Sequence, residues 1–304
     1  MQTNKGLALI VVLWVTTLLT IMASSFALTI QRETAITGGL KEKAQAAALA
    51  EAGINYAILM LLSNDNEQRW QANSSLYEIE LAGKRIRMLI ADEAGKININ
   101  LATNGQLQQL FDSLAIDEEL ADSLSDAILD WRDKNDLHRV NGAEMQQYEE
   151  AGLSYTPRNG AFKSVEEVQM VLGMTADIYK QLEGKISVYT KNKKINPVTA
   201  TREVLLTLPD VNAAMVDEYL LQRVESERNG ETVAQPEWYS GSGKSNVYMI
   251  IAEAMIAKDI SEKIMAIMKR GHAKNDLPFE ILKWAEDYPM PSLFLPGNDK
   301  RVIN

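Results

Sequence analysis

Acidic side chains are concentrated in the segment DWRDKNDLHRVNGAE, which runs from residue 130 to residue 144. Its four candidate metal ligands are Asp130, Asp133, Asp136 and Glu144. Residues three apart share one face of a helix, so the first two acids are expected side by side, with the other two in the loop that follows. Carboxylates at this density could hold Ca²⁺, although Leu137 falls where an EF-hand would need a ligand. Two interpretations stay open: a calcium site, or solvated acids in weak ion pairs.

The rest of the sequence offers no catalytic arrangement. The two histidines, His138 and His272, are far apart in the chain, and no serine occupies a nucleophile elbow. The segment GSGKS at residues 241–245 lacks the first glycine of a P-loop, because Trp238 stands there. Cysteine is absent, which excludes thiol nucleophiles, thiolate metal sites and disulfides. We expect a protein that is not an enzyme and requires no cofactor, with Ca²⁺ as the one candidate ion.

The charge of the chain argues against nucleic acid as a partner. The formal net charge is −10, from 41 acidic and 31 basic residues, whereas phosphate binding needs a basic face that releases counterions. Residues 195–223 look like a helix-hairpin-helix module of the DNA-binding kind. However, its turn at residues 209–212 contains no glycine and carries Asp210. We interpret this module as one used for packing or protein contact.

The first apolar run is long enough to cross a membrane. Residues 7–30 form 24 consecutive uncharged positions, and at about 1.5 Å per residue they span a bilayer core of about 30 Å. Lys5 precedes the run, and Arg32 and Glu33 end it. A lone basic residue on the N-terminal flank favours a cytoplasmic N-terminus.

Three interpretations of this N-terminus compete: a secretory signal peptide, a plain membrane anchor and a pilin-type leader. The run is longer than the apolar core of a secretory signal, which is about 7–15 residues. A short polar leader, Lys5, Gly6 and an apolar helix together resemble the class III signal of type IV pilins and type II secretion pseudopilins. That resemblance implies that prepilin peptidase cuts between Gly6 and Leu7, and that Leu7 is then N-methylated.

The fifth position of the mature chain separates members of these families. Most pilins and pseudopilins carry a glutamate there, and this sequence carries Val11. A carboxylate inside the bilayer is costly unless it is paired, and in those families it is thought to pair with a neighbouring subunit. The K subunit habitually lacks it, since a subunit at the tip of a filament has no subunit ahead of it to engage.

Hydrophobic patterning indicates a long helix followed by a hairpin. Apolar periodicity predicts one helix over residues 7–62, of which 7–30 lie in the membrane. Two alternating segments at 76–81 and 84–91, separated by two residues, predict antiparallel strands. The predicted parts, in order, are a leader at 1–6, the N-terminal helix at 7–62, the first sheet strands at 76–91, a first helical domain at 92–184, a strand at 185–190, a second helical domain at 191–235, and the remaining strands and tail at 236–304.

An internal repeat marks the entry to each helical part. Lys96-Ile97-Asn98 with Ala102-Thr103 recurs as Lys194-Ile195-Asn196 with Ala200-Thr201. Both copies follow a strand-like segment and lead into helices, which suggests two related helical modules. Capping boxes predict helix starts at Thr103 and Ser164.

Taken together, these segments resemble the minor pseudopilin K family of type II secretion, also called general secretion pathway protein K. The matching segments are Gly6 with LALIVVLW, Val11 in place of glutamate, DEAGKININLAT at 92–103, DWRDKND and NGAE within 130–144, PRNGAFKSVEEVQMVLGM at 157–174, KKINPVTATREVLLTLP at 193–209 and PFEILKW at 278–284. They cover nearly the whole chain. At Asn135 the resemblance leads us to expect another acid.

The resemblance implies an α+β fold in which a pilin-like long helix and antiparallel sheet carry a large inserted all-α region of SAM-like or helix-hairpin-helix-like modules. It implies assembly with minor pseudopilins I and J into the tip of the pseudopilus, which the protein starts and caps for export across the outer membrane. Further implied partners are other pseudopilins, prepilin peptidase, the inner-membrane secretion platform, and the secretin or secreted cargo. The chain would cross the inner membrane once, with a cytoplasmic N-terminus and a periplasmic bulk.

From the sequence alone, a second function stays open: an unprocessed, membrane-anchored periplasmic binding protein with helix-hairpin-helix modules. The Gly6 junction and the acidity of the helical modules favour the pseudopilin.

Overall fold

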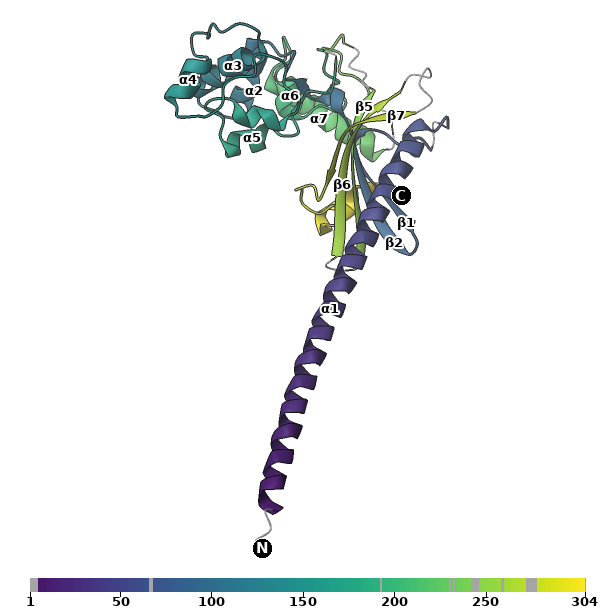
Figure 1. Cartoon of the computed structure of the whole chain (residues 1–304). Coiled ribbons are helices and arrows are strands. Elements are labelled where there is room, and N and C mark those ends of the chain that lie inside the picture. The colour runs from purple at the N-terminus through teal and green to yellow at the C-terminus, as the bar shows by residue number, and fades with distance from the viewer. Residues whose placement is uncertain are drawn as a thin grey trace.

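A single long helix extends from a body made of a sheet and a helical region (Figure 1). The computed structural model describes residues 5–65, 68–191, 193–229, 231, 233–241, 246–257, 260–271 and 278–303. His272, residues 242–245 of the GSGKS segment and residues 1–4 of the predicted leader lie outside this description. The sheet lies beside the C-terminal half of the helix, and the helical region projects to one side at the end remote from the N-terminus.

Helix α1 (Lys5–Leu62) has two halves with different surroundings. The side chains from Leu9 to Ile30 are exposed throughout, although the helix is long and apolar enough to cross a membrane, with a mean hydropathy of 2.2 in its most apolar window. The C-terminal half instead buries one face, at Ala46, Ala50, Ile54, Ala57 and Leu61. The first half is apolar without any protein partner, which is the pattern of a segment solvated by lipid.

Six strands form the main sheet. They are β1 (Asn73–Leu81), β2 (Lys84–Asp92), β5 (Val247–Ala257), β6 (Ile260–Arg270), β7 (Phe279–Glu286) and β8 (Val302–Ile303). Their order is β7-β6-β5-β2-β1-β8, and all neighbours are antiparallel except β1 and β8. The predicted β1–β2 hairpin is confirmed. Ala82 and Gly83 both have positive φ, at 52° and 70°, as a two-residue turn matched to strand twist requires.

The two faces of the sheet are covered by different parts of the chain. Strand residues alternate between the faces, so Ile250 packs toward α1 while Ile251 packs on the opposite face. Gly53 lets α1 approach closely, because a Cβ there would lie 2.7 Å from Ile86 Cγ2. On the opposite face, Leu293 of the C-terminal tail joins a cluster with Ile251 and Met265.

A buried carboxylate fastens the tail to that opposite face. Glu253 of β5 is 1% exposed and accepts hydrogen bonds from Ser292 Oγ at 2.9 Å and from the backbone N–H of Leu293 at 2.5 Å. The buried Arg87 donates to the carbonyl of Leu293 at 2.9 Å, and its guanidinium lies 4.7 Å from the ring centre of Phe294. The tail continues as a 3₁₀ turn, η3 (Pro296–Arg301), and ends in β8.

The helical region is inserted between β2 and β5. Its helices are α2 (Asn104–Ser113), α3 (Glu118–Arg132), α4 (Met145–Glu150), α5 (Ala176–Leu182), α6 (Arg202–Leu205) and α7 (Ala213–Arg228), with 3₁₀ turns η1 (Glu93–Gly95) and η2 (Glu166–Met170). Two short strands, β3 (Ile97–Asn98) and β4 (Ile186–Ser187), pair in parallel apart from the main sheet. One continuous buried cluster runs from Ile97 to Tyr219, so the two predicted helical modules share a single core.

The two copies of the repeat adopt the same local geometry. Asn98 Oδ1 accepts from the backbone N–H of Asn100 at 2.8 Å, and Asn196 Oδ1 accepts from that of Val198 at 3.1 Å. An arginine from a later helix reaches the same carbonyl in each copy. Arg132 donates to Ala102 O, and Arg223 donates to Ala200 O at 2.8 Å.

Helix-start predictions are confirmed at one capping box and wrong at the other. Thr103 accepts from the N–H of Gln106 at 3.2 Å and caps α2. Ser164 does not cap a helix, because η2 starts after Val165 and has no side-chain cap. The carboxylate of Glu167 is used elsewhere, by Trp131 Nε1 at 3.2 Å and by Arg158. The α+β class, with a long N-terminal helix, an antiparallel-rich sheet and further helices, is confirmed.

Candidate functional site

Helix α3 carries the first two acids of the candidate site. Asp117 caps its N-terminus by accepting from the N–H groups of Glu119 and Leu120, and a buried face that includes Leu124, Ile128 and Trp131 packs it into the core. Asp130 lies on that inward side and is fully buried, whereas Asp133 follows the last helical residue. The helix therefore places one carboxylate inside the protein and the other at its end.

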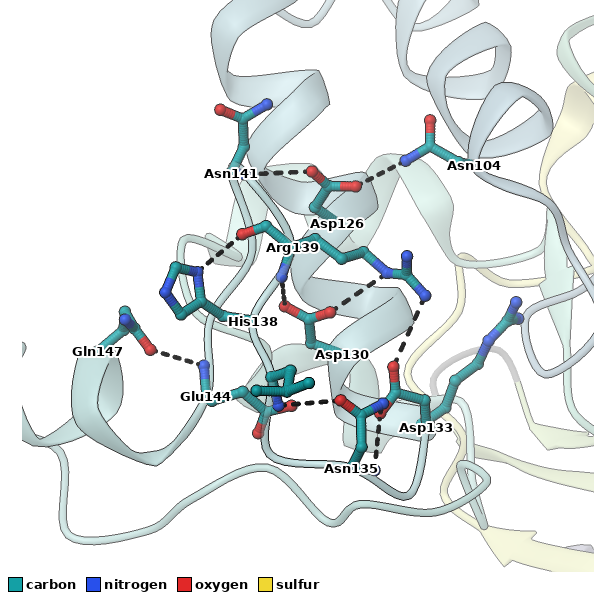
Figure 2. Close-up of polar contacts among 12 residues, drawn as sticks. Asn104, Asp126, Asp130, Asp133, Asn135, His138, Arg139, Asn141, Glu144 and Gln147 are labelled. Carbon is teal, nitrogen blue, oxygen red and sulfur yellow. Dashed lines mark hydrogen bonds and ion pairs between the residues drawn. The ribbon is translucent and has the colours of Figure 1, made fainter.

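The loop after α3 folds over Asp130 (Figure 2). Asp130 Oδ2 accepts from the backbone N–H of Arg139 at 3.0 Å, and Oδ1 lies 3.2 Å from Arg139 Nε. The same guanidinium lies 3.6 Å from Asp133 Oδ2. Gly142 is required beside this carboxylate, because a Cβ there would lie 1.9 Å from Asp130 Oδ2. Arg139 thus supplies the positive charge that a buried Asp130 needs.

The other two predicted ligands lie near this pair but face different partners. Asp136 accepts from Asn159 Nδ2 at 2.6 Å. Glu144 comes just before α4, is 4% exposed, and its backbone N–H donates to Gln147 Oε1 at 2.9 Å. Within the part of the chain that the structure describes, no three acidic, cysteine or histidine side chains converge closely enough to hold a metal ion as they stand.

Two buried carboxylate oxygens nevertheless lack a hydrogen bond among the described residues. They are Asp130 Oδ1 and Glu144 Oε1. Burial, the largest cause, and the neighbouring carboxylates of Asp130, Asp133 and Asp136 together raise the pKa of Glu144 to about 7. Burial also raises the pKa of Asp130, against the opposing effect of Arg139. The cluster therefore holds more negative charge than Arg139 alone compensates.

Sequence reasoning missed several residues that build this site. Asp126 accepts from Asn104 Nδ2 at 2.8 Å and from the backbone N–H of Asn141 at 3.2 Å, which ties the loop to α2. The same spacing rule that selected Asp130 and Asp133 could have found it, four residues earlier on the helix. Arg132, next to Asp133 in the sequence, donates to the carbonyls of Ile99 and Ala102.

The N-terminal candidates lie at the start of α1. The backbone of Gly6 and Leu7 is already helical, and the leader residues 1–4 lie outside the described residues. Val11 is 53% exposed, and the side chains around it on this part of α1, from Leu9 to Val15, are apolar and exposed as well. An isolated carboxylate at this position would have no described group of the same chain beside it, so valine suits a segment in contact with lipid.

Comparisons with known proteins agree on one family. The family model for the type II secretion system protein K matches residues 86–191. The type II secretion system protein K of Pseudomonas aeruginosa is 25% identical over 239 residues, which cover 70% of this chain and 71% of that protein. The protein of the same name from Aeromonas hydrophila is 25% identical over 229 residues, which cover 66% and 69%.

A solved structure shares the fold. It is a chain of the GspK-GspI-GspJ complex of the type 2 secretion system of enterotoxigenic Escherichia coli. The TM-score is 0.60 at 19% identity, and the match covers 82% of this chain and 98% of that one. The two chains therefore share a fold over most of their length. By sequence, the chain is similar to the type II secretion system protein K family, whose model matches residues 86–191, and its fold is similar to that of the solved chain.

Proposed function

We propose that this chain is a minor pseudopilin that assembles with minor pseudopilins I and J and forms the tip of the type II secretion pseudopilus. The observation that carries the proposal is the likeness over most of the chain to a protein solved in complex with those two subunits. The role is structural rather than catalytic, and it serves protein export. At the tip the protein would initiate the filament, cap it, and come within reach of the secretin or cargo.

The shape of the chain supports a terminal position. The helical region projects sideways from the axis of α1 (Figure 1). Pseudopilin subunits repeated along a filament would stack through their long helices, so a wide lateral region on every subunit would crowd its neighbours. One copy at the end avoids this crowding. The exposed apolar side chains of Tyr56 and Leu59, on the part of α1 beside the sheet, are a surface available for neighbouring helices.

We further propose that the chain is processed and anchored as a pseudopilin. Prepilin peptidase would cut between Gly6 and Leu7, methylate Leu7, and leave the helix in the inner membrane with its N-terminus in the cytoplasm. Lys5 on the N-terminal flank and the apolar exposed half of α1 support this orientation. Other pseudopilins and the inner-membrane platform would be its remaining contacts.

We also propose that Asp130, Asp133, Asp136 and Glu144 bind Ca²⁺. Glu144 Oε1 is buried without a hydrogen bond from the described residues, and the pKa of Glu144 is raised, which supports a missing positive charge at this site. Arg139 would have to withdraw from Asp130 and Asp133 to admit the ion, since it contacts both. The ion would supply charge neutralisation and fix the loop between α3 and α4.

Assembly can be tested with one charge placed on α1. Leu59→Asp puts a carboxylate on the surface proposed to meet subunits I and J, and we expect at least a tenfold loss of co-purified I and J. Leu137→Asp is the matched control, because Leu137 is 79% exposed in the distant loop after α3. Equal recovery of the complex with both variants would contradict the proposed contact surface.

Processing can be tested by intact-mass and N-terminal peptide analysis of membrane-extracted protein. With active prepilin peptidase we expect a chain that starts at N-methylated Leu7, and with inactive peptidase a chain that starts at Met1. Gly6→Leu should give the uncut chain in both cases. A chain that starts at Met1 despite active peptidase would argue for the unprocessed anchored protein, and a cut near residues 23–27 for a signal peptide.

Calcium and pH should act on stability through Glu144. Without calcium, the folded chain keeps a proton on Glu144 up to about pH 7, whereas the unfolded chain releases it near its ordinary pKa of 4.5. The free energy of unfolding should therefore fall as pH rises from about 4.5 to about 7, by up to about 3 kcal/mol. Glu144→Gln should remove this fall, while Glu149→Gln, at an exposed position of α4, should keep it. Urea unfolding at several pH values measures both.

The same variants test the ion itself. Calcium in place of a chelator at pH 7.5 should raise the melting temperature of the wild type and of Glu149→Gln, but not that of Glu144→Gln. An identical melting temperature of the wild type with calcium and with chelator would contradict calcium binding at this site. Arg139 would then be the cation that compensates Asp130.

A further inference from the structure

A second polar feature lies at the junction of the two repeat copies. It is a pocket of about 680 Å³, bounded by the start of α2 at Thr103 and Gln106, by Lys193 and Lys194, by the turn from Pro209 to Val211, and by Trp238 and Tyr239. The acidic cluster between α3 and α4 contributes none of its lining residues. The function proposed above makes no use of this pocket.

The walls of the pocket are fixed before any ligand arrives. Tyr239 OH donates to the carbonyl of Ile195 at 2.5 Å. The ring of Trp238 meets the buried ring of Tyr219 edge-on, with centroids 5.8 Å apart, and Tyr219 OH donates to the carbonyl of Ala234 at 3.1 Å. Trp238 and Tyr239 are half-buried. They form an aromatic wall that needs little reordering to bind a ligand.

The charge of the pocket is opposite to that of the protein. The chain carries −10 overall, but among the described residues the lining contains two lysines and a single acid, Asp210. Lys193 is exposed, and within the described residues no carboxylate lies within ion-pair distance of it. The first turn of α2 adds backbone N–H groups that have no acceptor inside the helix. An acidic protein that concentrates positive charge beside aromatic rings at one place is suited to an anionic ligand with an apolar part.

We propose that this pocket binds an extended acidic protein segment that carries an aromatic or aliphatic side chain. Carboxylates of the segment would pair with Lys193 and Lys194, and its apolar side chain would pack on Trp238. The mixture of polar and apolar lining fits a peptide better than a nucleic acid. Among the described residues only two lysines line the pocket, and the net charge of −10 would repel a continuous phosphate backbone.

Fluorescence anisotropy on the full chain in detergent tests the proposal with three labelled probes. They are a short peptide alternating glutamate with leucine and phenylalanine, the same peptide with lysine for each glutamate, and a single-stranded oligonucleotide of equal length. We expect the acidic peptide to bind at least tenfold more tightly than the other two. Equal binding of the basic peptide, tighter binding of the oligonucleotide, or no binding of the acidic peptide would each overturn the proposal.

Point variants locate the binding. Lys193→Gln should weaken the acidic peptide about fivefold and Trp238→Ala about tenfold or more. Lys180→Gln, an exposed lysine of α5 outside the pocket, is the matched control and should change nothing. Unchanged binding by Lys193→Gln and Trp238→Ala would place the peptide elsewhere and refute this site. Co-purification of I and J should survive Lys193→Gln, so failure of this inference is distinguishable from failure of the proposed assembly.

Discussion

The packing of α1 against the sheet is the contact on which the rest of the structure depends. The first half of this helix is apolar and exposed on every side, as a membrane anchor would be, and the second half is apolar on only one face, where it meets the sheet. The small residues Ala50, Gly53 and Ala57 make the second half possible, because they let the helix approach the strands at Ile86 and Ala252. A larger residue at position 53 would push the sheet away from the axis, and the globular body would lose its fixed position above the membrane segment.

The second constraint is the point where the helical region leaves the sheet. Glu93, directly after β2, is 1% exposed and forms an ion pair with Lys96. It also accepts from Ser187 Oγ in β4, at the far end of the first helical part, at 2.5 Å. Gly95 packs against Thr199 so closely that a Cβ would lie 2.6 Å from its Oγ1. One buried carboxylate and one glycine thus hold three segments that are distant in sequence together at the end of β2. These contacts explain how a large insertion projects from the sheet in a defined direction.

Local patterns predicted the parts of this fold that depend on neighbours in sequence. Sequence patterns predicted the charge-free run, the Ala82-Gly83 hairpin and the Thr103 cap. These features could be predicted because helix periodicity, turn conformation and capping act within a few residues. Contacts between residues distant in sequence could not be predicted from these patterns. They include the hydrogen bonds from the tail to Glu253 and the ion pair of Arg139 with Asp130. They also include the contacts of Glu167 with Trp131 and Arg158, which replace a capping box. The shared core of the two repeat copies was hidden for the same reason, although their common sequence correctly indicated a common geometry.

We propose that the lateral helical region confines this subunit to the end of the filament. Because the chain contains no cysteine, Val140→Cys creates a unique labelling position on a side chain that is 94% exposed. Electron tomography of pseudopili assembled with this variant and labelled with maleimide-gold would locate the subunit directly. The account predicts label at one end of each filament and none along the shaft. Label distributed along the shaft would contradict it.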